Sequence, residues 1–436
     1  MRGAIVAAVA VVLIARAVPA GAVARVSIFG PGSESFPIAV VPLKDQGGDA
    51  DHALGGRFAR VLSHDLDLSG YFRLLDPKTF IENDSAGLTA ETTDFVGWGA
   101  LGAQALVKGG ISVSGDTVTV EARLFDVPGR QEVAGSGRRY SGRRAELPRM
   151  AHRMADAILE YLTGERGPFD SEIALVRGKG GPLKDIYRFT FDMDEPARVT
   201  DERSIVVNPR WRPDVRAILF TSYREHQPRL FQVEVATRQV TPIGPRRGAV
   251  LDGAWSPDGS RLLATIERGG NSDIFLIDRD GQVLRQLTDH WDVDVAPAWA
   301  PDGRRFVFCS SRAGSPQVYA MDVDGGNPVR ISRTGSYNTS PAWSPKGDHI
   351  AYTTRSGGSF QIVVAAADGS GPQTIITSAG SNENPSWGAD GRYLVFSSTR
   401  GGRRHIYFAD RDGRTQKELT RGAWDDTSPS WSRRLD

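Results

Sequence analysis

Tryptophan recurs through the second half of this chain, each copy 44 residues after the last. A turn sequence follows most of these tryptophans, as in Ser256-Pro257-Asp258-Gly259. Proline presets φ and glycine accepts a positive φ, so this sequence favours a tight turn between two strands. Such constant spacing over five intervals indicates a structural repeat. The six tryptophans are Trp211, Trp255, Trp299, Trp343, Trp387 and Trp431.

Each repeat unit contains four short stretches of strand-like sequence. After Trp255 they cover residues 261–266, 273–278, 283–288 and 295–299. Four strands at a period of about 40–45 residues are typical of a β-propeller blade. A helical repeat would need segments of ten or more residues, for which the Pro-Asp-Gly turns leave no room.

The number of blades follows from the two ends of the repeat region. Residues 173–436 make 264 residues, which is six units of 44. The strand at 173–176 has no tryptophan six residues before it, whereas the strand at 427–431 has no unit after it. We therefore predict a six-bladed all-β propeller over 173–436, closed by its own C-terminal strand, which removes the exposed sheet edges.

The first 24 residues predict a secretory signal peptide. Arg2 precedes an apolar run over 4–15 that is too short to cross a bilayer of about 30 Å. Small residues follow and offer cleavage after Ala22 or Ala24. The alternative is an uncleaved amphipathic anchor, but Arg16 is the only charge in this stretch after Arg2. We expect an exported mature protein without a transmembrane segment.

Residues 25–165 lack the 44-residue period and predict a small α/β domain. Residues 36–42 favour a strand, 57–68 a helix with one apolar face, and 147–162 a final helix. A Gly115-Asp116 pair between two strand-like runs indicates a hairpin. A linker over 166–172 then leads into the propeller. The predicted fold is therefore mixed, a small N-terminal α/β domain followed by the propeller.

Charge and cysteine content restrict the classes of function. The net charge is +1, which argues against a dedicated nucleic-acid or anionic-membrane binder. The single cysteine, Cys309, excludes an internal disulfide and a cysteine zinc cluster. It lies in an apolar strand-like run and is best interpreted as a small buried hydrophobe.

Catalytic and cofactor motifs are weak in this sequence. Residues 97–102 satisfy G-x-G-x-x-G, but they lack the long helix of a dinucleotide site, so we interpret them as a turn between a helix and a strand. Aspartate-glycine sequences such as 278–281 resemble the start of a calcium loop but lack its bidentate glutamate, so we interpret them as turns between strands. Whether an ion occupies the channel stays open.

No serine stands in a G-x-S-x-G motif, and the seven histidines form no H-E-x-x-H. Arginine pairs such as 138–139 and 403–404 have acidic residues nearby and are interpreted as solvated loops. We predict no enzyme activity and no cofactor.

The segments before each repeat tryptophan are polar and differ among the blades. Loops that converge at the mouth of a propeller channel are typical binding surfaces. Variation on a constant scaffold favours a partner-binding rim, although exposed loops are polar in any case. The predicted rim residues are Arg247, Asp252, Asp292, Asp294, Tyr337, Asn338, Thr339, Asn382, Glu383, Asn384, Asp425 and Asp426.

The order of signal peptide, α/β domain and propeller with W-[SA]-P-D-G repeats resembles the TolB family of the periplasmic Tol-Pal system. The similarity covers the whole chain. It is most specific at residues 36–42, at Trp98 with Leu101-Gly102-Ala103, at Leu159 with Thr163-Gly164, and in the blade sequences 317–322 and 325–332.

This resemblance implies a non-catalytic adaptor in the periplasm, which we expect to be a monomer. Its propeller would bind the peptidoglycan-associated lipoprotein Pal, and its mature N-terminal segment would bind TolA. The complex would support outer-membrane integrity and constriction at division. The residues implied for TolA are Arg25, Val26, Ser27, Ile28 and Phe29, whose alternation suits strand addition to a partner sheet.

A second hypothesis is an exported propeller that acts on glycans or peptides, as an enzyme or as a ligand-binding module. It would require a cluster of channel carboxylates with perturbed pKa values.

Overall fold

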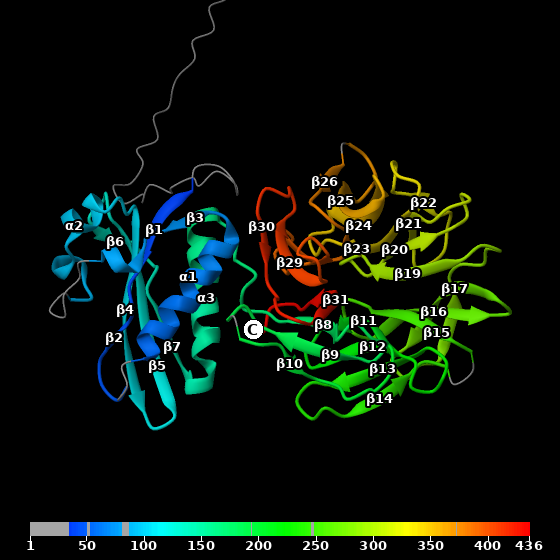
Figure 1. Cartoon of the computed structure of the whole chain (residues 1–436), viewed down its shortest axis with the longest axis horizontal. Coiled ribbons are helices and arrows are strands. Elements are labelled where there is room, and N and C mark those ends of the chain that lie inside the picture. Colours follow the sequence, from blue (N-terminus) through cyan, green and yellow to red (C-terminus); the bar gives the residue numbers. More distant parts are fainter. Residues whose placement is uncertain (1–34, 50–52, 81–86, 193, 246–247, 372) are drawn as a thin grey trace, which may run out of the picture.

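Two structural units follow one another along the chain (Figure 1). The computed structural model describes residues 35–436 apart from 50–52, 81–86, 193, 246–247 and 372. The predicted signal peptide and the segment 25–29 lie outside the described residues. Within them, no helix is both long enough and apolar enough to cross a bilayer.

The N-terminal domain is a seven-stranded mixed sheet with helices on it. The path of the sheet is β3-β1-β4-β5-β6, with β2 beside β4 and β7 beside β5. The strands are β1 (Phe36–Val40), β2 (Lys44–Asp45), β3 (Phe72–Leu74), β4 (Ala105–Ser114), β5 (Thr117–Asp126), β6 (Gln131–Glu132) and β7 (Arg138–Arg143). The α-helices are α1 (Leu54–Ser69), α2 (Phe95–Ala100) and α3 (Leu147–Thr163). Short 3-10 turns cover Pro77–Thr79, Ala90–Thr92 and Arg144–Glu146.

Helix ends in this domain follow local sequence signals. α1 ends at Gly70 and α3 at Gly164, both with positive φ, which only glycine adopts without strain. The predicted hairpin is β4 and β5, joined at Gly115 with φ of 62°. The G-x-G-x-x-G sequence is not simply a turn, because Gly97 and Gly99 lie within α2 and the chain turns only at Gly102, where φ is 80°.

Six four-stranded antiparallel sheets form the propeller, as predicted. Blades 1 to 5 follow in chain order, and each begins with the innermost strand, which ends at a repeat tryptophan. Blade 1 is β11 (Val206–Trp211), β12 (Ala217–Ser222), β13 (Arg229–Glu234) and β14 (Val240–Ile243). Blade 2 is β15 (Val250–Trp255), β16 (Arg261–Arg268), β17 (Asn271–Asp278) and β18 (Val283–Gln286). Blade 3 is β19 (Asp294–Trp299), β20 (Arg305–Ser310), β21 (Gln317–Asp322) and β22 (Val329–Arg330). Blade 4 is β23 (Asn338–Trp343), β24 (His349–Ser356), β25 (Ser359–Ala366) and β26 (Thr374–Ile376). Blade 5 is β27 (Asn382–Trp387), β28 (Tyr393–Ser398), β29 (His405–Asp410) and β30 (Gln416–Glu418).

A closing blade joins the two ends of the propeller sequence, as the repeat predicted. It consists of β8 (Ile173–Gly178), β9 (Lys184–Phe189) and β10 (Ala197–Arg198), with β31 (Asp425–Trp431) as its innermost strand. β31 runs antiparallel to β8, with Trp431 opposite Ile173. The Pro-Asp-Gly and Asp-Gly turns have positive φ at glycines such as Gly259 and Gly281. Cys309 is buried in β20, and burial raises the pKa of its thiol to about 11.

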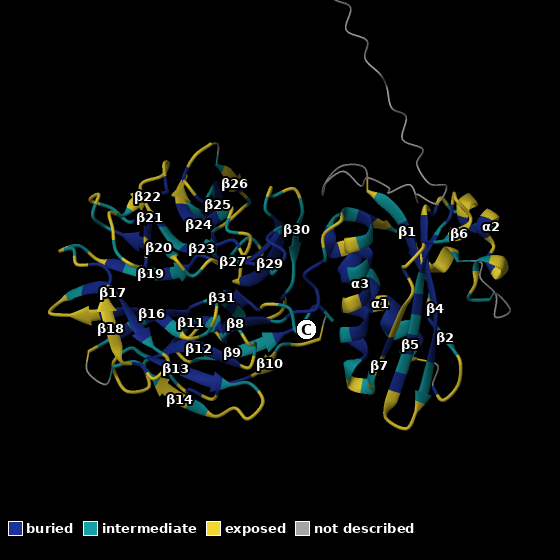
Figure 2. Ribbon diagram, turned by 180° about the vertical axis from the view of Figure 1, so that it is seen from behind, coloured by how far each residue is buried: buried dark blue, intermediate teal, exposed yellow. Residues whose placement is uncertain are grey.

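The two units share one hydrophobic core. α1 and α3 lie between the N-terminal sheet and the propeller (Figures 1 and 2), and their buried face continues into the closing blade and blade 5. Phe191, Phe408 and Trp431 from the propeller belong to the same cluster as Leu62 and Ile158 from the helices. Apolar burial on this scale stabilises the arrangement of the two units, because the effect grows with the area removed from water.

Polar contacts complete this domain interface. The Tyr393 hydroxyl donates to the Ser69 carbonyl at 2.8 Å, and the Lys417 ammonium donates to the Asp67 carbonyl at 2.7 Å. Glu165, just after α3, pairs with Lys346 of blade 4 at 2.8 Å. The end of α1 and the segment after α3 are therefore both fixed to the propeller.

His64 provides a test of this interface. It lies on α1 beside an interdomain cavity of about 440 Å³ that Phe191 and Glu418 also line. Burial lowers the pKa of His64 to about 4, with Asp67 opposing and Lys417 reinforcing the shift. The unfolded chain therefore takes up this proton near pH 6.5 and the folded protein near pH 4, so His64 reduces folding stability as the pH falls between these values.

We expect His64→Gln to remove this loss, on the order of 2 kcal/mol between pH 7 and pH 4. The measurement is the urea midpoint of both proteins across that range. Buried Asp65 and Asp156 have raised pKa values and act in the opposite direction, but they are common to both proteins and cancel in the difference. His226→Asn, at an exposed histidine, serves as the control. If the urea midpoints of wild type and His64→Gln change with pH in the same way, the prediction is contradicted.

Candidate functional site

The six innermost strands surround the axial channel and all run in the same direction. Each begins at one mouth of the channel, which we call the rim, and ends at its tryptophan at the other, which we call the tryptophan mouth. Six extended residues place the two mouths about 20 Å apart. Neighbouring blades are tied at the tryptophans, because the Trp299 indole donates to the Ala254 carbonyl and that of Trp387 to the Ala342 carbonyl, both at 3.0 Å.

A bulge interrupts five of these strands at the same position. The pairing register shifts there, and the third residue before the tryptophan has a positive φ although it is not glycine. A bulge sets two consecutive residues against one on the partner strand, and the third and fourth residues before each tryptophan are both half-buried in these strands. Strained backbone of this kind concentrates at functional sites. The residues concerned are Asn208, Ala296, Ser340, Asn384 and Ser428, with φ of 49° to 58°.

Four of the predicted rim residues are buried structural ties. They share the fifth position before a repeat tryptophan and are fully buried. Asp294 pairs with Arg312 at 2.8 Å, and Asp426 pairs with Arg177 through two contacts of 2.7 and 2.9 Å. The asparagines at the equivalent positions form hydrogen bonds through their side-chain amides. Asn338 donates to Gln317 at 2.7 Å, and Asn382 donates to Gln361 at 2.8 Å. Asp294 and Asp426 are thus held within their own blades, whereas Asn338 and Asn382 are held by the preceding blade, and none of the four side chains is presented to a partner.

Asp252 is also buried, in the strand of blade 2 that lacks the positive-φ residue. Its carboxylate accepts a hydrogen bond from the Gly253 amide at 2.8 Å. Burial raises the pKa of Asp252 to about 6, although the nearby positive charge of Arg210 opposes the shift. Its carboxyl is therefore more readily protonated than an exposed aspartate.

The remaining described rim residues reach solvent. Tyr337 is 39% exposed, and Asp292, Thr339, Glu383, Asn384 and Asp425 are half-buried. The Asn384 amide donates to the Ser340 hydroxyl of the neighbouring blade at 3.3 Å, so the bulges of blades 4 and 5 are linked. Arg247 lies outside the described residues.

Around the rim, apolar and polar groups occupy different blades. At the fourth and sixth positions before the tryptophan, blades 1 to 3 carry mainly apolar side chains, and blade 5 and the closing blade carry polar ones. We define the apolar arc as Ile205, Val207, Leu251, Trp291, Val293, Val295 and Tyr337. We define the polar arc as Thr339, Glu383, Asn384, Asp425 and Thr427.

Trp291 is the most exposed large apolar residue of the apolar arc. It is 82% exposed, stands just before β19 and stacks on the His290 ring at a centroid distance of 5.4 Å. The predicted rim set omitted it because it lies outside the 44-residue phase. Its position outside the repeat was the sequence signal that could have identified it, because a tryptophan that does not follow the repeat has no role in the repeated core. Exposed tryptophans are frequent anchors of protein interfaces.

Among the described residues, no three histidine, cysteine, aspartate or glutamate side chains lie close enough to hold a metal ion. The two arcs present an extended surface for contact with another molecule.

Two family models match the chain, one in each unit. Residues 24–133 match the TolB amino-terminal domain, and residues 159–435 match the TolB beta propeller domain. Curated relatives include the Tol-Pal system protein TolB of Syntrophotalea carbinolica, 39% identical over 197 residues that make up 45% of each chain. The same protein of Geobacter sulfurreducens is 40% identical over 187 residues, 43% of this chain and 42% of the relative. The matched regions therefore span less than half the length of these relatives.

The fold agrees with a solved structure over nearly the whole chain. Crystalline TolB from Acinetobacter baumannii is 26% identical, with a TM-score of 0.78, and the match covers 93% of this chain and 98% of that chain. The similarity therefore extends over both units. With a family model on the propeller and a second on the N-terminal domain, the chain belongs to the TolB family.

Proposed function

We propose that this chain is a non-catalytic periplasmic adaptor of the Tol-Pal system. Its propeller rim binds the lipoprotein Pal, and its mature N-terminal segment, residues 25–29, binds TolA. In this role it supports outer-membrane integrity and constriction during division. Membership of the TolB family supports the assignment of this chain to the Tol-Pal system. The curated relatives are named as proteins of the same system.

The observation that carries the proposal is the division of the rim into an apolar arc and a polar arc. A protein interface commonly combines a desolvated aromatic anchor with a surrounding polar surface. Trp291, Val293 and Tyr337 supply the first, and Glu383 and Asn384 supply the second. The near-zero net charge suits recognition by shape and local contacts over long-range attraction.

Trp291→Ala is expected to weaken binding of the periplasmic domain of Pal by about 2 kcal/mol or more, roughly thirtyfold in Kd. The reason is loss of an exposed aromatic side chain that becomes buried on binding. Isothermal titration calorimetry with Pal from the same genome gives the measurement. Leu284→Ala is the matched control, because this residue of β18 is 54% exposed and apolar but belongs to an outer strand. Equal affinity of wild type and Trp291→Ala would reject Trp291 as the anchor.

The polar arc requires variants that preserve the fold. Thr339→Ala with Glu383→Gln changes half-buried side chains, whereas a change at Asn338 would also break a buried tie. Deletion of residues 25–29 tests the TolA contact separately and is expected to leave Pal binding intact. Failure to recover Pal with the wild-type protein under crosslinking would overturn the proposal as a whole.

A further inference from the structure

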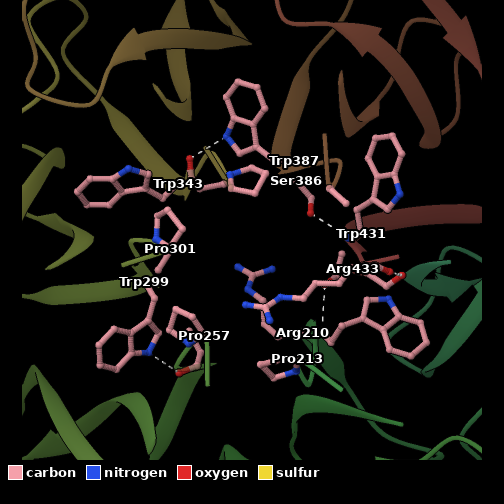
Figure 3. A pocket seen from close by; sticks show the side chains of 18 of the residues that line it. Arg210, Pro213, Pro257, Trp299, Pro301, Trp343, Ser386, Trp387, Trp431 and Arg433 are labelled. Carbon is pink, nitrogen blue, oxygen red and sulfur yellow. Dashed lines mark hydrogen bonds between the residues drawn. The ribbon is translucent and has the colours of Figure 1, made fainter. Parts of the chain in front are cut away.

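The tryptophan mouth, opposite the rim, contains a cavity that the proposed adaptor role does not use. Its volume is about 260 Å³. The six repeat tryptophans, four prolines of the turns that follow them and small residues of the innermost strands form its wall. Figure 3 shows that Arg210 and Arg433 extend into the middle of this ring. The cavity therefore has an apolar wall and a cationic centre.

Both arginines break the pattern of the repeat. The residue before each tryptophan is Ala or Ser in every innermost strand except β11, which carries Arg210. The second residue after each tryptophan is Pro or Ala except after Trp431, where it is Arg433. These two departures lie 223 residues apart in the sequence, and the closure of the ring by β31 brings them to one mouth.

Neither guanidinium forms an ion pair with a carboxylate of the described residues. Arg210 donates only to the carbonyl of its neighbour Pro209, at 3.3 Å, and the Arg433 side chain has no hydrogen-bond or ion-pair partner there. The third arginine of the wall, Arg212, differs because it pairs with Asp214 at 2.8 Å and Glu234 at 2.9 Å. Two positive groups in one small cavity, neither of them in an ion pair among the described residues, favour an anionic ligand.

The C-terminal tail holds Arg433 in this position. The amides of Ser432 and Leu435 donate to the carbonyls of Glu172 and Asp170, both at 2.9 Å. Arg434 donates to the Gly167 carbonyl at 3.0 Å, on the side of the linker. The neighbouring side chain of this tail, Arg433, extends into the cavity (Figure 3). A tail anchored on both sides of Arg433 limits the entropy lost when its side chain binds.

We propose that the tryptophan mouth is a carboxylate-binding site that takes the free C-terminus of a peptide. Paired guanidinium groups match the planar geometry of a carboxylate, and the indole and proline wall suits the apolar side chain next to it. The cavity has room for about one terminal residue, since it is smaller than the pockets of about 300–1,000 Å³ that hold drug-sized ligands.

Neighbouring carboxylates favour a singly charged ligand over phosphate. Asp258 and Asp302 border an adjoining hollow that Arg433 also lines. Their charges would repel a doubly charged anion more strongly than a single carboxylate. In β15, the innermost strand of blade 2, the charge of Asp252 interacts with that of Arg210.

The test uses the full mature chain and three probes, namely acetyl-Ala-Ala with a free carboxylate, the same peptide amidated, and inorganic phosphate. Calorimetry is expected to detect the free acid and to show at least tenfold weaker binding of the amide and of phosphate. Arg210→Gln and Arg433→Gln should each weaken binding of the acid at least tenfold. Asp252→Asn should strengthen it several-fold, because it removes a competing negative charge. Arg139→Gln, an exposed arginine of β7 with a side chain 73% exposed, is the matched control.

Pal binding and thermal melting of each variant separate this inference from the proposed function. A folded Arg433→Gln protein that retains Pal binding and loses the peptide acid would support the site at the tryptophan mouth. Equal binding of acid and amide, tighter binding of phosphate, or no binding at millimolar concentration would overturn it, whatever the outcome of the Pal experiment.

Discussion

Removal of residues 425–436 is expected to abolish the cooperative unfolding transition of the propeller. These residues include β31, the innermost strand of the closing blade, which pairs with β8 from Asp425 opposite Gly178 to Trp431 opposite Ile173. Figure 1 shows β31 in red beside β8 in green, although they lie at opposite ends of the propeller sequence. Without β31 the ring is open and β8 presents an unpaired edge.

The same truncation removes part of the interdomain core. Trp431 packs against Phe191 and Phe408, with ring centroids 5.5 and 5.9 Å apart, and its indole donates to the Ser171 hydroxyl at 2.7 Å. Loss of a buried tryptophan side chain alone costs about 3–5 kcal/mol. A folded domain has about 5–15 kcal/mol of net stability, so loss of the strand and the tryptophan together leaves little or none.

Differential scanning calorimetry gives the measurement. The matched control lacks only residues 433–436, which keeps β31 and removes the tail contacts with the linker. We expect this control to retain a single transition at a lower Tm. If the protein that lacks residues 425–436 unfolds with the transition enthalpy of the wild type, the closing strand is dispensable.

Asp426→Ala is expected to destabilise the protein by about 3–5 kcal/mol, the range for breaking a buried ion pair by removing one partner. Asp426 is fully buried and holds Arg177, whose side chain is 3% exposed, through two contacts. After the substitution, the ion-pair partner that Arg177 retains among the described residues is Glu195, at 3.3 Å, whose side chain is 86% exposed. A largely buried positive charge therefore loses its main counter-ion.

Guanidinium chloride unfolding of three proteins tests this explanation. Asp425→Ala is the adjacent control, because this side chain is a quarter exposed and lies 3.9 Å from Arg403, so its ion pair contributes about 1 kcal/mol or less. The double variant Arg177→Met with Asp426→Leu should recover much of the lost stability, since it removes both charges and fills the space. If Asp426→Ala and Asp425→Ala have equal stability, the buried pair does not have the role we assign to it.

The rim shows where sequence reasoning reached its limit. Polarity before each tryptophan correctly located one mouth of the channel, but it did not separate the buried Asn338 from the half-buried Thr339 next to it. The partner of Asn338 is Gln317, 21 residues earlier in blade 3. Such a contact depends on how two blades pack, and no local pattern encodes it. Trp291 was missed because it lies outside the 44-residue phase, and its exposure depends on the loop before β19.

The sequence by itself determined the two units, the six blades and the closure by the C-terminal strand. These features follow from local physics, because turn residues, strand alternation and a constant period act over a few residues and are repeated six times. The tertiary structure decided which polar residues are buried, how the helices α1 and α3 join the propeller core, and that Arg210 and Arg433 meet at the tryptophan mouth. Those outcomes required the ring to close, since closure brings residues from both ends of the propeller into contact and removes others from water.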